Sequence, residues 1–223
     1  MLRFSAIFLK KIFFNKQNKP FGAYFPGIVI FSFLVFSFDS LRYVFKNDEE
    51  NEEYIEWSEK RKLRWSDYKG KPQKRNAVAS TCYELRYIFP TTLDGVVQPT
   101  VSVRALFFPK DSWKLDAFAN DYILSHEQGH FDLVEIFARR LRRAIHSREY
   151  NSLDDLYAHI HSMYDTINKK MEEIQELYDE ETENSMNSVL QQKWNSIIQK
   201  ELNELRNFHQ PVIHLQGKIN EKK

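Results

Sequence analysis

Residues 123–137 read ILSHEQGHFDLVEIF, and this stretch constrains the fold more than any other part of the chain. Its apolar residues recur at steps of three and four, which is the pattern of a core-facing α-helix. On such a helix His126 and His130 lie about 40° apart around the axis and one turn along it. Two imidazoles at that spacing can bind one cation. Glu127 lies about 100° from His126, where its carboxylate can reach a water beside the cation rather than the cation itself.

The resulting H-E-x-x-H pattern is typical of hydrolytic zinc sites. The histidines supply two nitrogen ligands, an open position takes a water, and the glutamate accepts the proton of that water. The sequence therefore predicts Zn²⁺ as cofactor, His126 and His130 as metal ligands and Glu127 as catalytic base. The alternative is a pair of helix histidines satisfied by hydrogen bonds, with Glu127 as a solvated charge.

The N-terminal part of the chain has the charge pattern of a membrane-anchored protein. Basic residues occur in residues 1–20 before any acidic one, and residues 21–38 are an uncharged run of 18 that ends at Asp39. A run of that length is just long enough to cross a bilayer as a helix. We therefore expect a basic cytoplasmic lead at 1–20 and a transmembrane signal anchor at 21–38.

A cleaved signal peptide is the main alternative to the anchor. The long basic lead, the length of the apolar run and the lack of an A-x-A motif at its end argue against cleavage. The positive-inside rule then places the N-terminus in the cytoplasm. The rest of the chain is expected on the periplasmic side of the cytoplasmic (inner) membrane.

Charge and cysteine content exclude further features. The formal net charge is +1, and Lys and Arg are mixed with Asp and Glu over most of the chain, so no nucleic-acid partner is expected. Cys82 is the only cysteine, which rules out a disulfide within the chain. Residues 39–62 are highly charged and lack a periodic apolar face, which indicates a linker. The folded domain is predicted at 63–208, followed by a flexible tail at 209–223.

Within that domain, the pattern changes from strands to helices. Residues 78–89 and 100–108 are rich in β-branched and aromatic residues and are each closed by a proline, so they predict two antiparallel strands. Three helices are predicted after them: the motif helix to about His146, a long helix capped by Ser152, and a third helix at 189–205. The predicted fold class is α+β, a small antiparallel β-sheet followed by a helical bundle that carries the zinc helix.

Several separated motifs share an order and spacing with one known family. They are LRWSDYKG at 63–70, SW at 112–113, LSHEQGHFD at 124–132 continuing through Glu135 to Arg139, YDEET at 178–182, and then Asn187, Gln191 and Trp194. The chain resembles a bacterial domain-of-unknown-function family with an HEQGHF motif, whose members are described as secreted zinc-dependent proteases. The resemblance covers the predicted domain but not the anchor, and it implies zinc and a peptide or protein substrate.

The chain departs from that family at one point. After the Tyr-Asp-x-x-Thr motif the family often continues with x-His-Gly, whereas this chain has Asn184 and Ser185. If the histidine of the family is a zinc ligand, this chain lacks it, because amide oxygens are uncommon zinc ligands.

The third metal ligand must therefore come from elsewhere, since a catalytic zinc usually takes three protein ligands and a water. The helix that starts near Ser152 runs back along the motif helix, so its C-terminal end returns to the two histidines. Asp179 is the first choice as third ligand and Glu181 is the next. The competing interpretation of Asp179 is a solvated or capping carboxylate at a helix end.

Together the motif and the resemblance predict a membrane-anchored zinc metallopeptidase that acts outside the cytoplasm. Glu127 takes a proton from the attacking water and returns it to the leaving amine. Tyr178 is a candidate to stabilise the tetrahedral oxyanion. Two other classes stay open. One is an envelope-anchored interaction protein with a structural metal or none, and the other is a zinc hydrolase of non-peptide bonds, such as amide links in cell-wall material.

Overall fold

The computed structural model describes residues 53–73, 77–89, 92–93, 96–97, 100–215 and 219. The predicted cytoplasmic lead, the predicted anchor at 21–38 and the first part of the predicted linker lie outside these residues. Within the described part, no helix is long and apolar enough to span a membrane.

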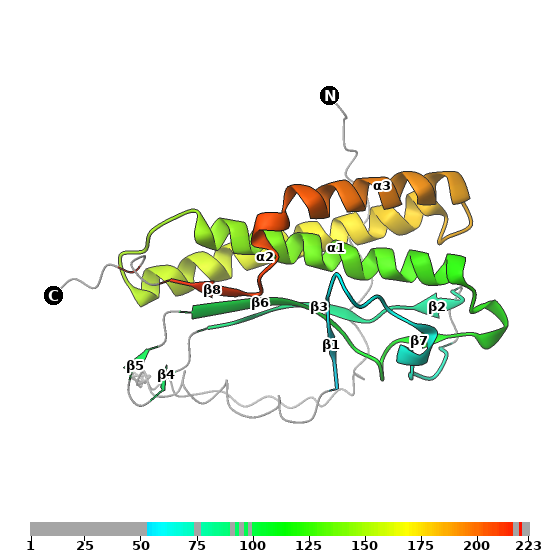
Figure 1. Cartoon of the computed structure of the whole chain (residues 1–223), viewed down its shortest axis with the longest axis horizontal. Coiled ribbons are helices and arrows are strands. Elements are labelled where there is room, and N and C mark those ends of the chain that lie inside the picture. Colours follow the sequence, from blue (N-terminus) through cyan, green and yellow to red (C-terminus); the bar gives the residue numbers. More distant parts are fainter. Residues whose placement is uncertain are drawn as a thin grey trace, which may run out of the picture. The chain divides into compact units, whose positions relative to one another are not determined.

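The fold is α+β, with small antiparallel sheets followed by three helices (Figure 1). The predicted strand at 100–108 is present as β6 (Thr100–Phe107), whereas the one predicted at 78–89 is divided into the short β2 (Ala79–Ser80) and β3 (Tyr83–Ile88). β3 and β6 pair antiparallel with Leu85 opposite Ala105. Two-stranded sheets are formed by β2 with β7 (Trp113–Lys114), and by β4 (Thr92–Leu93) with β5 (Val96–Val97).

The main sheet also contains two strands that the sequence did not predict. β1 (Ile55–Glu56) pairs with one end of β6 and β8 (Val212–His214) pairs with its other end. The segments expected as a linker through residue 62 and as a flexible tail from residue 209 thus each contribute a strand to this sheet. Strands of two and three residues are too short to show a periodic pattern. They form because β3 covers one edge of β6 and leaves the backbone groups of its other edge to be paired.

All three predicted helices are present, and the first ends at His146 as predicted. They are α1 (Asp121–His146), α2 (Leu153–Thr182) and α3 (Ser188–Glu204). Each has a polar N-cap side chain that accepts a hydrogen bond from the first helical turn: Asn120, Ser152 and Asn187. Short 3₁₀ helices lie at Trp65–Asp67, Asp116–Phe118 and Arg206–Phe208.

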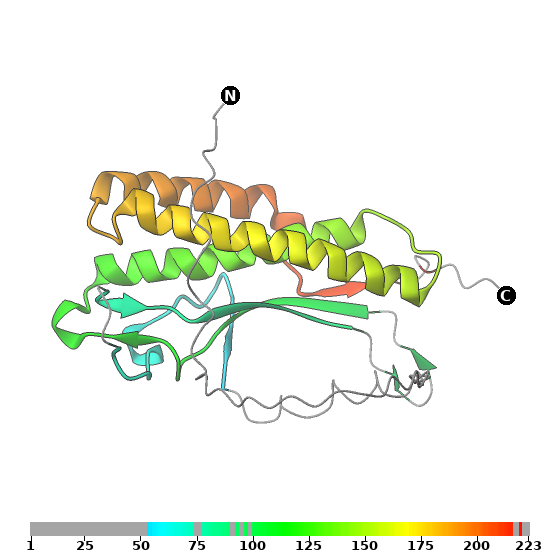
Figure 2. The ribbon, with the colours of Figure 1, turned by 180° about the vertical axis from the view of Figure 1, so that it is seen from behind.

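Helix α1 is the centre of the domain. It lies between the strands on one side and α3 on the other, with α2 alongside it (Figures 1 and 2). Alternate residues of β6 pack under α1 and α2 in one apolar core, and a second core joins α1, α2 and α3. Every residue of α1 from 129 to 139 is consequently buried, including its charged ones. The metal motif sits where this buried stretch begins.

Candidate metal centre

Three metal-binding side chains meet between α1 and α2. His126 and His130 come from α1 and Asp179 from the last turn of α2. The Nε2 atoms of the histidines are 3.2 Å apart, and the Oδ1 atom of Asp179 lies 3.1 Å from one and 3.0 Å from the other. Glu181, the second choice for this position, is turned away and accepts a hydrogen bond from Trp194 at 2.8 Å. The three residues together could hold a metal ion.

Two glutamines determine which nitrogen of each imidazole carries the proton. The side-chain amide of Gln175 donates to the backbone carbonyl of His130 at 3.0 Å, so its Oε1 atom faces the Nδ1 atom of His130 at 2.6 Å. An amide oxygen only accepts, and Nδ1 must therefore carry the proton. In the neutral imidazole the Nε2 atom of His130 then carries a lone pair that points at His126 and Asp179.

The same assignment follows for His126. Its backbone carbonyl can only accept, so the Tyr178 hydroxyl 3.1 Å away donates to it. The oxygen of Tyr178 then accepts from the amide nitrogen of Gln191 at 2.6 Å, which turns the Gln191 oxygen toward His126 Nδ1 at 2.8 Å. In their neutral forms both histidines thus present an unprotonated Nε2 to the same point.

This arrangement bears on the choice between a metal site and a pair of hydrogen-bonded histidines. Two nitrogen lone pairs and a carboxylate oxygen within 3.2 Å of one another repel unless a cation or a proton lies between them. In a tetrahedral zinc site the ligand atoms lie about 3.3–3.4 Å apart, so each edge of this triangle would lengthen by roughly 0.1–0.4 Å. The donor set therefore fits a divalent cation.

The acid–base properties of the group point the same way. Burial alone lowers the pKa of His130, but the hydrogen bond and charge of Asp179 outweigh it, so the pKa of His130 is raised. Burial alone raises the pKa of Asp179, yet its hydrogen bonds to both histidines hold its pKa well below the usual range. The site thus favours positive charge at its centre.

The metal group is shielded from solvent at its two histidines and exposed to solvent at Asp179. Both histidines are buried, whereas the side chain of Asp179 is 42% exposed. Within the described residues no fourth histidine, cysteine or carboxylate joins the three. A bound cation would therefore keep a position for water or substrate.

Glu127 is buried beside this group but does not belong to it. Its side chain points to the junction of β2 and β3, where the Thr81 hydroxyl donates to Glu127 Oε2 at 2.6 Å. The structure thus separates Glu127 from the three ligand-type residues, in agreement with the angular offset expected from the helix.

Gly129, between the two histidines, allows α2 to approach α1. A Cβ atom at this position would lie 2.3 Å from the hydroxyl oxygen of Tyr178, whose ring stacks on His126 at a centroid distance of 4.7 Å. Tyr178 is fully buried, and its hydroxyl is held by the His126 carbonyl and by Gln191. The hypothesis that Tyr178 stabilises an oxyanion is therefore wrong, because this hydroxyl supports His126 and cannot reach a substrate.

We expect Gly129→Ala to destabilise the protein by about 1–3 kcal/mol, because overpacking outweighs the better helix propensity of alanine. Urea unfolding followed by circular dichroism measures this, with Ser125→Ala on the exposed side of α1 as control. Adding Tyr178→Phe removes the clashing oxygen and should restore part of the loss. Equal stabilities of Gly129→Ala and Ser125→Ala would contradict the close contact.

The sequence did not identify Gln175 and Thr81, and it identified Gln191 only through the family motifs. Gln175 lies one helical turn before Asp179, and this spacing was the one local signal that could have found it. Asp132 and Glu135 do not join the metal group and pair with Lys62 and Arg139 instead. Asn184, at the position of the family histidine, is exposed in the turn after α2.

That turn explains the glycine of the family pattern. Glu183, Asn184 and Ser185 all have positive φ angles, of 52°, 49° and 72°. Glycine adopts this left-handed region without steric cost, whereas serine does so less easily. Asp179 completes the group of three, which therefore forms without a histidine at 184.

Comparison with protein families identifies the family of the chain. The family model described as "Bacterial protein of unknown function (DUF922)" matches residues 46–187, which include the whole motif stretch and Asp179. No curated protein and no solved structure matches the chain.

Proposed function

We propose that this chain, which belongs to the DUF922 family of bacterial proteins of unknown function, is a zinc-dependent hydrolase that cleaves peptide bonds. One observation carries the proposal. Two imidazole lone pairs, fixed by Gln175 and Gln191, meet a carboxylate at one point, and a further buried carboxylate, Glu127, lies next to them.

The donor set supports zinc in a catalytic rather than a structural role. Structural zinc sites are closed by four protein ligands, whereas catalytic sites have three and keep one position open. Two histidines and a carboxylate form such a three-ligand set, and the described residues contribute no fourth ligand. This argues against an interaction protein with a purely structural metal.

Zinc, when bound, supplies a Lewis acid that activates water and polarises a carbonyl oxygen. Glu127 accepts the proton of the attacking water and delivers it to the leaving amine nitrogen. His126 and His130 hold their ligating nitrogens unprotonated because their other nitrogens donate to Gln191 and Gln175. The reaction thus depends on groups that α1, α2 and α3 bring together.

A peptide or protein substrate is supported by the strand beside the site. β3 pairs with β6 and with no other described strand, and its first residue, Tyr83, has its ring 6.5 Å from that of His130. An extended peptide can bind to such a strand edge through backbone hydrogen bonds. We further propose that residues 21–38 anchor the enzyme in the inner membrane with its catalytic domain in the periplasm.

Metal content tests the ligand assignment. We expect the full chain, purified in detergent with zinc and then dialysed, to hold about one zinc ion, the number that one three-ligand site takes. His126→Ala, His130→Ala and Asp179→Asn should each lower the zinc content measured by mass spectrometry without unfolding the protein. His161→Ala, at an exposed histidine of α2, is the matched control. Full zinc occupancy in a variant that lacks both His126 and His130 would refute the site.

A further inference from the structure

A hydrogen-bonded chain reaches Glu127 from the core of the sheet. The Thr81 hydroxyl lies 2.6 Å from Glu127 Oε2, and the Tyr68 hydroxyl lies 2.8 Å from Thr81 Oγ1. A carboxylate can only accept, so the single proton of Thr81 is directed to Glu127. Tyr68 must then donate to Thr81, and the chain runs in one direction, from phenol to hydroxyl to carboxylate.

The phenol at the start of this chain is firmly held. Tyr68 is buried, and its ring packs between Trp65 and Phe107, with centroid distances of 5.0 Å and 5.2 Å. Burial raises the pKa of Tyr68 well above its usual range, and the negative charge of Glu127 adds to this effect. Tyr68 therefore stays protonated and remains a donor.

Thr81 is the one described residue that donates a hydrogen bond to the Glu127 side chain. The distance of 2.6 Å is in the range of a strong bond between a hydroxyl and an ionised carboxylate. A free glutamate side chain has several rotamers to lose, and a bond that fixes one carboxylate oxygen removes this freedom before substrate arrives. The other oxygen, Oε1, is left available for a proton.

We propose that Thr81, held by Tyr68, is a positioning residue that aims the free oxygen of Glu127 at the proton it accepts. This inference rests on the proposed hydrolytic function. It predicts that the threonine hydroxyl matters for proton transfer to Glu127 but not for metal binding.

Two small ligands of a bound metal separate these effects without any substrate. Acetohydroxamic acid can transfer a proton to a carboxylate beside the metal when it binds, whereas the azide anion has no proton to transfer. The full chain in detergent is loaded with cobalt(II), whose visible spectrum reports both the ligand set and the binding of either probe. The variants are Thr81→Val, which removes the hydroxyl but keeps the shape, Thr81→Ser, which restores a hydroxyl, and Tyr68→Phe. Thr166→Val, at an exposed threonine of α2, is the matched control.

We expect Thr81→Val to bind acetohydroxamic acid about tenfold more weakly, as for the loss of one hydrogen bond to a charged group. Azide affinity, cobalt content and the cobalt spectrum should match wild type. Thr81→Ser should restore acetohydroxamate affinity, and Tyr68→Phe should fall between wild type and Thr81→Val.

Other outcomes would overturn the inference in distinguishable ways. If Thr81→Val binds both probes like wild type, the positioning role is wrong while the metal site stands. If Thr81→Val weakens the binding of both probes equally or loses cobalt, and Tyr68→Phe does the same, Thr81 has a structural role only. If wild type binds no cobalt, the proposed function fails and the positioning role fails with it.

Discussion

Replacing Glu127 with glutamine is expected to reduce hydrolysis about 10²–10⁴-fold while zinc content and helical structure stay unchanged. Glutamine keeps the size of the side chain, and its amide oxygen can still accept from Thr81. It cannot take the proton of the attacking water, so the barrier should rise by about 3–5 kcal/mol. The measurement compares turnover of fluorescein-labelled casein with zinc content for wild type and variant.

Glu173→Gln is the matched control, because Glu173 is an exposed glutamate of α2 paired with Lys170. It should retain wild-type turnover. If the wild type is active and Glu127→Gln is equally active, the role of Glu127 as base is refuted. Loss of zinc from Glu127→Gln would instead make Glu127 a ligand and change the site geometry.

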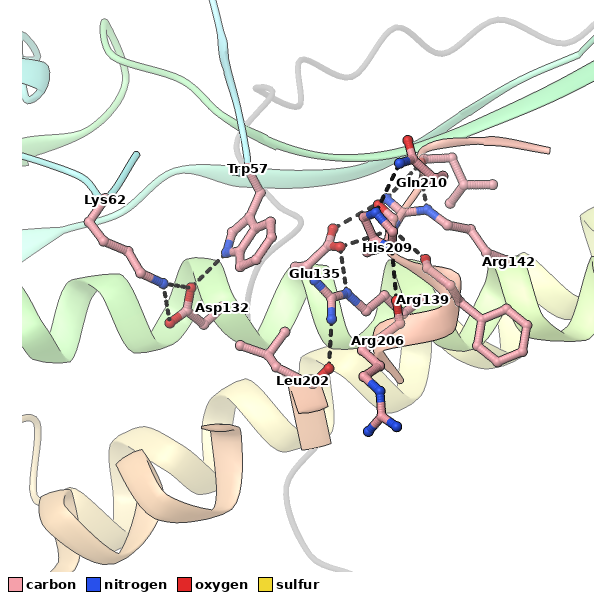
Figure 3. A network of polar contacts seen from close by, with 12 residues as sticks. Trp57, Lys62, Asp132, Glu135, Arg139, Arg142, Leu202, Arg206, His209 and Gln210 are labelled. Carbon is pink, nitrogen blue, oxygen red and sulfur yellow. Dashed lines mark hydrogen bonds and ion pairs between the residues drawn. The ribbon is translucent and has the colours of Figure 1, made fainter. Parts of the chain in front are cut away.

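The second large effect is expected on stability, at a buried ionic network on α1 (Figure 3). Glu135 accepts hydrogen bonds from Arg139 at 2.8 Å and from Arg142 at 2.9 Å, and all three side chains are buried. The arginines in turn donate to backbone carbonyls of Val103 in β6 and Leu202 in α3. This network therefore ties α1 to the sheet and to the end of α3.

Glu135→Gln removes the negative charge from between two buried guanidinium groups. Leaving buried charges without a counter-charge typically costs about 3–5 kcal/mol, a large part of the stability of an ordinary domain. We expect the melting temperature to fall by about 6–20 °C. Thermal unfolding followed by circular dichroism measures the change.

Glu201→Gln is the control for this prediction. Glu201 of α3 pairs with Arg140 of α1 at 2.8 Å, and both side chains are partly exposed, so the loss of this pair should cost less than about 1 kcal/mol. If the two variants unfold at the same temperature, the buried network contributes little to stability.

Next to this network, Asp132 shows why β1 could not be found from the sequence. It accepts hydrogen bonds from Trp57 at 2.6 Å and from Lys62 at 3.2 Å (Figure 3). Both partners lie in the segment predicted as linker, whose charged composition hid the contacts. A lysine that pairs with a buried aspartate has the same sequence signature as a lysine in solvent.

The local features of the chain were predictable because they depend on neighbours in sequence. The spacing of His126, Glu127 and His130 on one helix follows from helical periodicity alone. The cap at Ser152 and the alternation along β6 are equally local, and the structure confirms both. The anchor at 21–38 stays a prediction, since it lies outside the described residues.

The choice between Asp179 and Glu181 depended on tertiary structure. Two residues apart on a helix, their side chains point about 160° away from each other, so only the rotation of α2 decides which one faces the histidines. That rotation is set where Tyr178 packs on Gly129, a contact between residues far apart in sequence.

By itself, then, the sequence determined the two histidines and the glutamate of the site, the α+β class and the three helices. Tertiary structure decided which carboxylate meets the two histidines, the short strands β1 and β8, and the glutamines that fix the tautomer of each neutral histidine. The physical reason is the range of the interactions involved. A helical period acts between residues one turn apart, whereas a lone pair is directed at a metal only when three separate helices have packed together.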